Sequence, residues 1–558
     1  MKPLRQSLAT GALAALSLGG CAETSSELFA ERSGTPPSGD GTLRLDEAGD
    51  ILDGPVIGDC SRACGNSGFG GSEVIAGDLD ADGYDDILLN VPGHSRDLSR
   101  DSPGGVYVVY GRPTWADDAT VAPDAILELD GRFGGNTFAL ARAGDVDGDG
   151  HDDFLVGDNH VGICSLEALE PGSAIDQDDL GFGRAYLVYG GPARLSGVVP
   201  IADVASTFVD ETPCKGLGAA VSSAGDLDGD GFGDFVLGGD PGAPYVPDRV
   251  GEGRAYLFYG SGERRPAMNS VATADATLRG GSDVAGFGRG LASAGDVDGD
   301  GVGDLLISEN LDVIWYIDGE EVVTDSATYL VAGGDRMAGD VDATASPAIA
   351  IFKGKGHHGL RSAGLGDLDE DGLDDFALDG WGGNVGDDIA AFIFYGRADG
   401  FAPSVDASSA DIILREPLDL DYGLASPLAA AGDRDGDGHR DIIIGRYNMS
   451  DPQGGASVIG GTGARWTGDF LIDDIATSYV GSRPPPFPSP PFSVEEDPWR
   501  FDHAGLSVAG DGDIDGDGTA DLIVGAPGTD SLGRVYLLRG PDGTTESTST
   551  PRSAGAPK

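Results

Sequence analysis

Seven copies of one acidic loop carry the residues whose types and spacing could do chemistry in this chain. Each copy reads D-x-D-x-D-G-x-x-D, and the copies start at Asp78, Asp145, Asp226, Asp296, Asp367, Asp433 and Asp513. They recur at intervals of 66 residues (Asp367 to Asp433) to 81 residues (Asp145 to Asp226). We call them loops 1 to 7 and number their positions 1 to 9. Such regular recurrence indicates a repeat protein.

The loop pattern suits a hard divalent cation. Alternate Asp residues at positions 1, 3 and 5 place three carboxylates inside a tight turn, and Gly at position 6 permits the bend. We expect position 7 to offer its main-chain carbonyl and the Asp at position 9 to close the cage. Ca²⁺ takes six to eight oxygens, whereas Mg²⁺ keeps its waters and demands strict octahedral geometry. The sequence therefore predicts about seven Ca²⁺ ions, and an acidic turn without metal is the alternative that seven matching copies disfavour.

The predicted ligands follow directly from this numbering. They are Asp78, Asp80, Asp82, Tyr84, Asp86; Asp145, Asp147, Asp149, His151, Asp153; Asp226, Asp228, Asp230, Phe232, Asp234; Asp296, Asp298, Asp300, Val302, Asp304; Asp367, Asp369, Asp371, Leu373, Asp375; Asp433, Asp435, Asp437, His439, Asp441; and Asp513, Asp515, Asp517, Thr519, Asp521. The position-7 members contribute only carbonyls. The loop is not an EF-hand, because Leu89 and Leu237 stand where a bidentate Glu is needed at position 12.

Short β-type runs surround every loop. A small-residue run such as Val74–Ala76 precedes it, and an apolar run such as Ile87–Leu89 follows. A third run (Val106–Tyr110) and a shorter fourth (Ile126–Leu129) complete the repeat. Four strands in seven repeats predict an all-β, seven-bladed propeller of antiparallel blades. The last repeat lacks a fourth strand, so we expect residues 42–45 to complete it and close the ring.

The repeats resemble FG-GAP repeats, the units of the seven-bladed propeller of integrin alpha subunits. Phe69-Gly70 and Phe287-Gly288 match the FG start, and Gly525-Ala526-Pro527 is a literal GAP. Other copies depart from these flanks but keep the acidic loop, and the resemblance covers about residues 42–540. It implies that the acidic loops join strands 1 and 2 on one face. It also implies that ligands use the opposite face, built from the connections between strands 2 and 3 and between blades.

Composition excludes several classes of protein. The 558 residues include 94 Asp and Glu against 35 Lys and Arg, a formal net charge of −59. A nucleic-acid binder or an anionic-membrane binder needs the opposite balance. The 94 Gly residues exclude a long helical protein.

The N-terminus reads as an export signal. Lys2 and Arg5 precede an apolar run from Leu8 to Leu18, and Leu18-Gly19-Gly20-Cys21 resembles a bacterial lipobox. We expect a signal peptide at 1–20, lipidation of Cys21, a flexible tether at 21–41, the propeller at 42–540 and a disordered tail at 541–558. The predicted location is the cell envelope: periplasm or cell surface, at the outer membrane in a diderm. An ordinary secretory signal is the alternative.

Four further cysteines suggest two disulfides in an exported chain. On the face that the resemblance assigns to ligands, Cys164 and Cys214 fall near one blade boundary and form the preferred pair. Cys60 and Cys64 would then pair locally. Metal binding by cysteine is the weaker alternative, because the spacing lacks paired CxxC motifs.

The function predicted from these observations is non-catalytic recognition or adhesion. The sequence has no GxSxG and no HExxH motif, and the ring uses nearly all of the chain. An aromatic and proline-rich rim, with Trp315, Tyr316, Tyr329 and the run 484–492, could dock a sugar or peptide. The alternative, favoured for any single residue, is that the prolines stiffen a long loop and the aromatics cover the blade edge. We expect a monomer without nucleic-acid partners. A passive calcium-stiffened scaffold and, less favoured, a hydrolase with a site on the loop face are the alternatives.

Overall fold

The computed structural model describes twenty segments of the chain. They are residues 42–44, 50–53, 72–91, 104–115, 122–129, 139–159, 183–212, 216–239, 253–281, 286–310, 315–317, 320–322, 325–345, 348–355, 362–380, 389–416, 427–446, 454–481, 504–527 and 533–540. Within these segments, no helix has the length and apolar character that a bilayer crossing requires.

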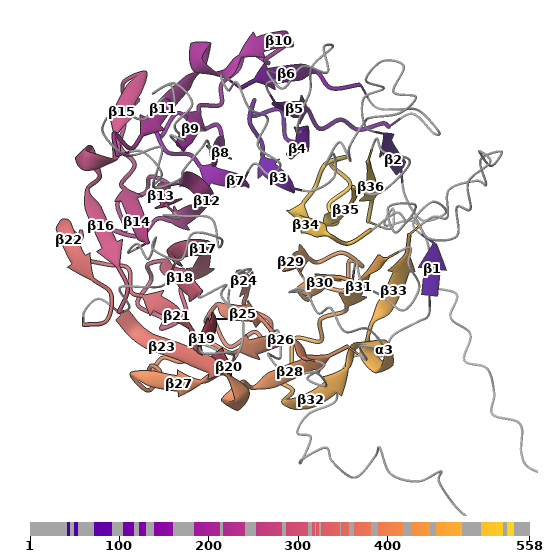
Figure 1. Cartoon of the computed structure of the whole chain (residues 1–558). Helices are drawn as coiled ribbons and strands as arrows, with labels where there is room; N and C mark the ends of the chain where they lie inside the picture. The colour runs from indigo at the N-terminus through magenta and orange to yellow at the C-terminus, as the bar shows by residue number, and fades with distance from the viewer. Residues whose placement is uncertain are drawn as a thin grey trace, which may run out of the picture.

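Seven blades stand around a central axis and form a β-propeller, as the sequence predicted (Figure 1). Their four antiparallel strands, from the axis outward, are as follows. Blade 1 has β3 (Glu73–Gly77), β4 (Asp86–Val91), β5 (Gly105–Val109) and β6 (Ala125–Glu128); blade 2 has β7 (Ala139–Gly144), β8 (Asp153–Asp158), β9 (Arg184–Val188) and β11 (Ala205–Val209); blade 3 has β12 (Leu217–Gly225), β13 (Asp234–Gly239), β14 (Arg254–Phe258) and β16 (Ala276–Arg279).

The other four blades repeat the plan. Blade 4 has β17 (Gly286–Gly295), β18 (Asp304–Asn310), β21 (Asp325–Val331) and β23 (Ala348–Lys355); blade 5 has β24 (Ala363–Gly366), β25 (Asp375–Asp379), β26 (Ile389–Phe394) and β28 (Ile412–Arg415); blade 6 has β29 (Leu428–Gly432), β30 (Asp441–Gly445), β31 (Gly455–Ile459) and β33 (Thr477–Val480); blade 7 has β34 (Ser507–Gly512), β35 (Asp521–Ala526), β36 (Arg534–Leu538) and β2 (Asp50–Asp53). Blade 4 also carries the hairpin β19 (Trp315–Ile317) and β20 (Glu320–Val322).

A fifth, parallel strand that the sequence analysis did not foresee joins most blades on the outside. It comes from the following blade, between that blade's third and fourth strands. These strands are β10 (Gly197–Pro200) on blade 1, β15 (Met268–Ser270) on blade 2, β22 (Gly339–Asp342) on blade 3, β27 (Ser404–Asp406) on blade 4 and β32 (Gly468–Leu471) on blade 5. Short helices, such as η2 (Ile201–Asp203), η3 (Val271–Thr273), η4 (Ala407–Ser409) and α3 (Ile472–Ile475), lead back into the fourth strands.

An N-terminal segment closes the ring, but the strand predicted to complete the last blade is a different one. Strand β1 (Thr42–Arg44) pairs in parallel with β33, so it is the fifth strand of blade 6. The fourth strand of blade 7 is β2, which pairs antiparallel with β36. The prediction of 42–45 was wrong because it counted four strands per blade. The N-terminus instead supplies a fifth strand to blade 6 and then the fourth strand of blade 7, in the same order as the connections within blades 2 to 6.

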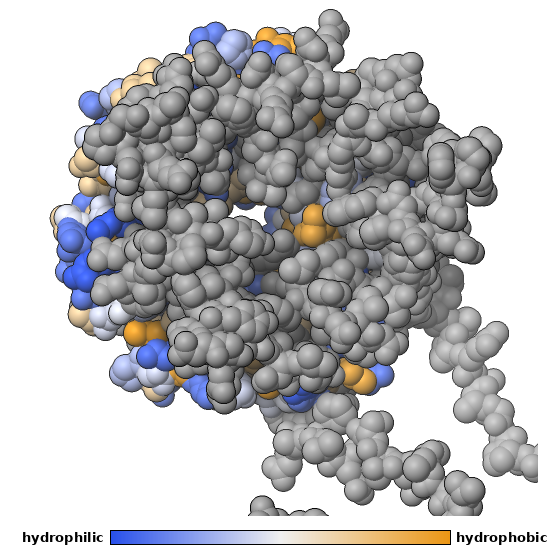
Figure 2. Space-filling model, in the orientation of Figure 1, coloured by the Kyte–Doolittle hydropathy of each residue, from blue (hydrophilic) through white to orange (hydrophobic). Residues whose placement is uncertain are grey.

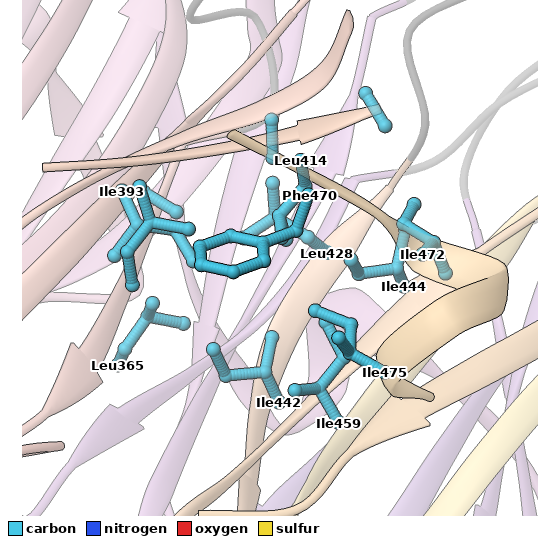
Figure 3. Packing of buried hydrophobic residues seen from close by; sticks show 14 of the residues in the cluster. Leu365, Ile393, Leu414, Leu428, Ile442, Ile444, Ile459, Phe470, Ile472 and Ile475 are labelled. Atoms are coloured by element: carbon cyan, nitrogen blue, oxygen red, sulfur yellow. The ribbon is translucent and has the colours of Figure 1, made fainter. Parts of the chain in front are cut away.

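The hydrophobic core lies between neighbouring blades. In the cluster that joins blades 5 and 6, Leu365, Ile393, Leu414 and Phe470 face Ile442, Ile444 and Ile459, and α3 contributes Ile472 and Ile475 (Figure 3). Second strands such as β4 are buried on both sides because each blade has a neighbour on both faces. Fourth strands such as β6 and β16 alternate buried and half-buried residues. The space-filling view shows an opening at the centre of the ring (Figure 2).

Candidate metal centres

Each acidic loop joins the first strand of a blade to the second, as the family resemblance implied. Backbone amides fold every loop around its own carboxylates. The amide of position 6 donates to the Asp at position 1, over 2.8 to 2.9 Å in all seven loops. The amide of position 7 donates to the Asp at position 5. These bonds turn the carboxylates of positions 1, 3 and 5 toward one another.

Glycine at position 6 adopts the left-handed conformation that the bend requires. Its φ lies between 89° and 94° in all seven loops. Position 4 is also left-handed, which the sequence analysis missed: five loops have Gly there, and Ala81 and Glu370 have φ of 56° and 59°. The side chain at position 7 of the next loop explains part of this preference. A Cβ on Gly148 would lie 2.4 Å from the ring of Phe232, and one on Gly516 would lie 2.5 Å from Tyr84.

The Asp at position 9 is a buried clamp as well as a candidate ligand. One of its oxygens accepts the amide of position 2, and the other accepts the amide of a Gly that follows the third strand. In blade 1, Asp86 accepts from Leu79 and Gly111, each over 2.8 Å. All seven blades repeat the pair of bonds. The residue therefore ties its loop to the third strand of the same blade.

Burial raises the pKa of every position-9 carboxyl, and neighbouring aspartates raise it further. The pKa rises to about 8 at Asp86 and Asp375 and to about 6 at Asp441. At the other four blades, Asp153, Asp234, Asp304 and Asp521, it rises to about 7. Desolvation is the larger of these two causes. A bound cation would favour the charged form.

The donor set fits a hard cation. Oxygens from Asp78, Asp80 and Asp86 lie within 4.8 Å of one another, as do those of Asp145, Asp147 and Asp153. Loops 3, 4 and 5 bring positions 1, 3 and 5 together equally closely. Buried oxygens without a hydrogen-bond partner are present in three loops: Oδ1 of Asp80, Asp369 and Asp433. A buried carboxylate oxygen without a partner is costly unless a cation satisfies it.

Backbone hydrogen bonds also link the loops of neighbouring blades. The amide of position 8 donates to the carbonyl of position 1 in the preceding loop, for example from Asp152 to Asp78 over 3.1 Å. The carbonyl of position 2 accepts an amide from the segment after the next blade's third strand, for example from Gly191 to Leu79 over 2.8 Å. The acidic loops are therefore part of the blade boundaries.

Four arginines that the sequence analysis did not single out lie on these loops. Each comes from the segment after the third strand of the following blade, and its guanidinium pairs with the Asp residues at positions 3 and 5. They are Arg194 on Asp80 and Asp82, Arg264 on Asp147 and Asp149, Arg336 on Asp228 and Asp230, and Arg465 on Asp369 and Asp371. We call these four residues the latch arginines.

Each latch arginine also stacks on a tyrosine of the blade that it contacts. The rings are Tyr110, Tyr189, Tyr259 and Tyr395, at 4.5 to 4.9 Å from the guanidinium carbon to the ring centroid. The hydroxyl of each tyrosine accepts the amide of the residue after the arginine. A Tyr-Gly pair directly after the third strand, in blades 1, 2, 3 and 5 alone among the seven, is the sequence signal that could have found the latch.

Other predicted residues are placed differently or lie outside the described residues. Tyr329 is a core residue of β21, only 3% exposed, and its hydroxyl donates to Glu309, so it packs within the blade, as the structural alternative expected, and is not part of a docking rim. The side chains of His151 and His439 bond to Asp149 and Glu370. The signal peptide, Cys21, Cys60, Cys64, Cys164, Cys214, the tether, the tail and the proline-rich run lie outside the described residues. So do the connections between second and third strands, except for the hairpin of β19 and β20 in blade 4, which holds Trp315 and Tyr316.

Fold and loops together define a seven-bladed β-propeller with an acidic loop between the first two strands of every blade. The FG-GAP repeat model matches residues 70–109 and 504–538, which contain the loops of blades 1 and 7. The chain is similar to Integrin alpha-PS2 of Drosophila melanogaster, with 28% identity over 251 residues, 44% of this chain and 16% of that protein. Integrin alpha-5 of Xenopus laevis is 29% identical over 171 residues, 30% of this chain and 15% of that protein.

The similarity extends to a protein whose name is that of an enzyme. Phosphatidylinositol-glycan-specific phospholipase D of Mus musculus is 28% identical over 226 residues, 39% of this chain and 24% of that protein. The chain thus spans about a quarter or less of the length of these relatives. A solved structure, rhamnogalacturonan lyase YesW, aligns with 75% of this chain and 69% of its own at 11% identity and a TM-score of 0.27. That score carries no argument about fold or activity.

Proposed function

We propose that this chain is a calcium-stabilised propeller that acts as a non-catalytic recognition or adhesion module. The observation that carries the proposal is the sevenfold acidic loop, with inward-facing carboxylates and buried unpartnered oxygens at Asp80, Asp369 and Asp433. Ca²⁺ supplies charge neutralisation there, and the loops at the blade boundaries transmit the effect to the whole ring. The similarity to integrin alpha subunits supports recognition as the function of this scaffold.

The ligand is proposed to be a protein or glycan of the cell envelope. The rigid ring offers a platform on which variable connections can carry binding residues. Export, lipid anchoring through Cys21 and the two disulfides belong to the same proposal, because millimolar Ca²⁺ is a property of extracytoplasmic space. The enzyme alternative has one observation in its favour, namely the similarity to the mouse phospholipase D.

Affinity capture tests the proposal. The chain from Ala22 onward is immobilised in millimolar Ca²⁺, exposed to envelope and glycan extracts, and eluted with a chelator for mass spectrometry. We expect a specific protein or polysaccharide in the eluate. The control is a column that carries the Asp298→Asn/Asp300→Asn variant, checked for folding by circular dichroism. It identifies material that the chelator releases from acidic surface sites unrelated to the loops.

Three results distinguish the alternatives. An empty eluate from a folded, calcium-loaded column favours the passive scaffold. Chemical change in the applied glycans or lipids, lost when loop-face residues are changed, favours the hydrolase. Binding that is identical with and without Ca²⁺ contradicts the calcium part of the proposal.

A further inference from the structure

The latch arginines divide the seven loops into two classes. Loops 1, 2, 3 and 5 receive an arginine from the next blade, whereas the residue at the equivalent sequence position is Gly400 for loop 4 and Trp115 for loop 7. The equivalent of loop 6, Thr544, lies outside the described residues. The stacking tyrosine follows the same division. At its position, between the third strand and the next Gly, blades 4, 6 and 7 have Ala332, Gly460 and Arg539. The arginine and the tyrosine on which it stacks are distant in sequence, yet at each loop they are either both present or both absent.

The geometry leaves room for an arginine and a cation on the same loop. Each guanidinium uses Oδ2 of the Asp residues at positions 3 and 5, as in loop 2, where Arg264 lies 2.7 Å from Asp149. In loops 1 and 5 the other oxygen of the position-3 Asp remains buried without a partner. Those Asp side chains are only 5% and 1% exposed. The arginine therefore neutralises the outer side of the carboxylates and leaves the inner side to a metal.

We propose that the latch arginines act as resident cations that keep loops 1, 2, 3 and 5 folded against the next blade when Ca²⁺ is absent. Loops 4, 6 and 7 depend on Ca²⁺ for that role. The inference rests on the proposed calcium function and deepens it. Loss of Ca²⁺ then loosens the ring at defined boundaries, namely 4/5, 6/7 and 7/1, while the boundaries 1/2, 2/3, 3/4 and 5/6 hold.

The charges support this division. Four aspartates in a metal-free loop repel one another, and one guanidinium with two charge-assisted bonds offsets part of that repulsion. The stacked tyrosine, which also accepts the amide of the residue after the arginine, holds the arginine in place. The arginine therefore loses little conformational entropy when it pairs with the aspartates. Loops 6 and 7 have weaker substitutes. Arg434, at position 2 of loop 6, donates to the carbonyl of Arg539 in blade 7 over 3.3 Å, and the guanidinium of Arg539 lies 3.6 Å from Asp515 of its own blade.

Hydrogen exchange measured by mass spectrometry on the whole chain, with Ca²⁺ or with EGTA, tests the proposal. The amide of position 6 makes the same hydrogen bond in every loop, so Gly150 and Gly301 report on loops 2 and 4 under matched conditions. In EGTA we expect loop 4 to exchange about tenfold or more faster than loop 2. In Ca²⁺ we expect all seven loops to be protected.

An Arg264→Met variant tests the contribution of a single latch arginine. In EGTA its loop 2 should exchange at the rate of loop 4, while in Ca²⁺ it should remain protected. Arg397→Met is the matched control, because Arg397 follows the third strand of blade 5 but its guanidinium pairs with Asp411. Its contact with loop 4 is a main-chain hydrogen bond to Val297, which the substitution keeps. Loop rates in this control should match those of the unmodified chain.

The outcomes separate the two proposals. If loop 2 already exchanges as fast as loop 4 in the unmodified chain with EGTA, or if Arg264→Met leaves loop 2 unchanged there, the latch proposal is wrong. The comparison within the unmodified chain stands even if the variant fails to fold. If Ca²⁺ protects no loop at all, including loop 4, the calcium function itself fails.

Discussion

At the scale of single residues, backbone conformation decides which loop positions tolerate a side chain. Position 6 needs glycine for its φ alone, because a Cβ on Gly301 would meet nothing within 4 Å. Position 4 has the same left-handed conformation, yet loop 1 has Ala81 there with φ of 56°. An L-residue other than Gly, Asn or Asp held in this region is strained by about 1–2 kcal/mol.

Opposite substitutions at these two positions should therefore have opposite effects. Gly301→Ala should lower the free energy of unfolding by about 1–2 kcal/mol in Ca²⁺, and Ala81→Gly should raise it by up to about 1 kcal/mol. Urea titration at fixed Ca²⁺ measures both. A destabilised Ala81→Gly variant would show that the methyl group contributes packing that outweighs the strain.

Glu73 supplies a pH dependence outside the acidic loops. It is buried in β3, its Oε2 accepts a hydrogen bond from Ser507 of blade 7, and its Oε1 has no partner. Burial raises the pKa of its carboxyl from 4.5 to about 8. The unfolded chain releases this proton near pH 4.5 and the folded chain only near pH 8. Stability should fall as pH rises through that window, by about 1.4 kcal/mol per pH unit from this group.

A Glu73→Gln variant should remove that slope. Its free energy of unfolding should match that of the unmodified chain near pH 4.5 and exceed it increasingly toward pH 8. Chemical denaturation at five pH values measures the difference, with Glu263→Gln, at an exposed position of blade 3, as the control. Parallel curves for Glu73→Gln and the unmodified chain would show that the carboxyl is already charged in the folded state.

At the scale of strands, the sequence predicted the repeat but not the exchange of outer strands. Inner strands such as Ile87–Leu89 are apolar and regular, so their positions could be predicted from pattern alone. The fifth strands are half exposed, with Val198 57% and Met268 65% exposed. Their sequences show no alternation of apolar and polar residues that would distinguish a strand from a loop. Their pairing is fixed by the neighbouring blade, which one repeat's sequence cannot show.

The candidate site divides in the same way. Local spacing predicted the carboxylates at positions 1, 3 and 5 and the glycine at position 6, because a nine-residue turn sets them. Arg264 and Asp147 are 117 residues apart, so their contact depends on how blades stack. The double role of Asp86 likewise depends on Gly111, which follows the third strand of the blade and lies 25 residues further along the chain.

Removing the N-terminal strands should open the ring. A chain lacking residues 1–53 loses β1 and β2, whereas a chain lacking residues 1–41 keeps both. The longer deletion should cost about 2–4 kcal/mol, because the four paired residues of β2 no longer cover β36. Thermal unfolding of the two chains measures this loss. A synthetic peptide of residues 42–53 should restore the stability of the chain with the longer deletion. Closure by β2 would be contradicted if the two chains were equally stable and the peptide had no effect.

At the scale of the whole molecule, calcium should stabilise the ring as a sum over its loops. With site affinities of about 10⁻⁴–10⁻³ M, 1 mM Ca²⁺ adds about 0.4–1.4 kcal/mol per site, or about 3–10 kcal/mol for seven independent sites. Asp298→Asn/Asp300→Asn should lower the calcium-dependent gain by about one site's share. Urea unfolding in Ca²⁺, Mg²⁺ and EGTA tests this, and equal stability in all three media would contradict calcium binding.

The order in which strands pair has a consequence for biosynthesis. Strands β1 and β2 leave the ribosome first, yet their partners β33 and β36 are among the last segments to be made. Each blade from the first to the fifth likewise waits for its successor before its outer edge is covered. A chain that emerges from its N-terminus therefore carries open strand edges until β36 is made, and termination before that strand leaves an unsealed ring that invites aggregation or chaperone capture.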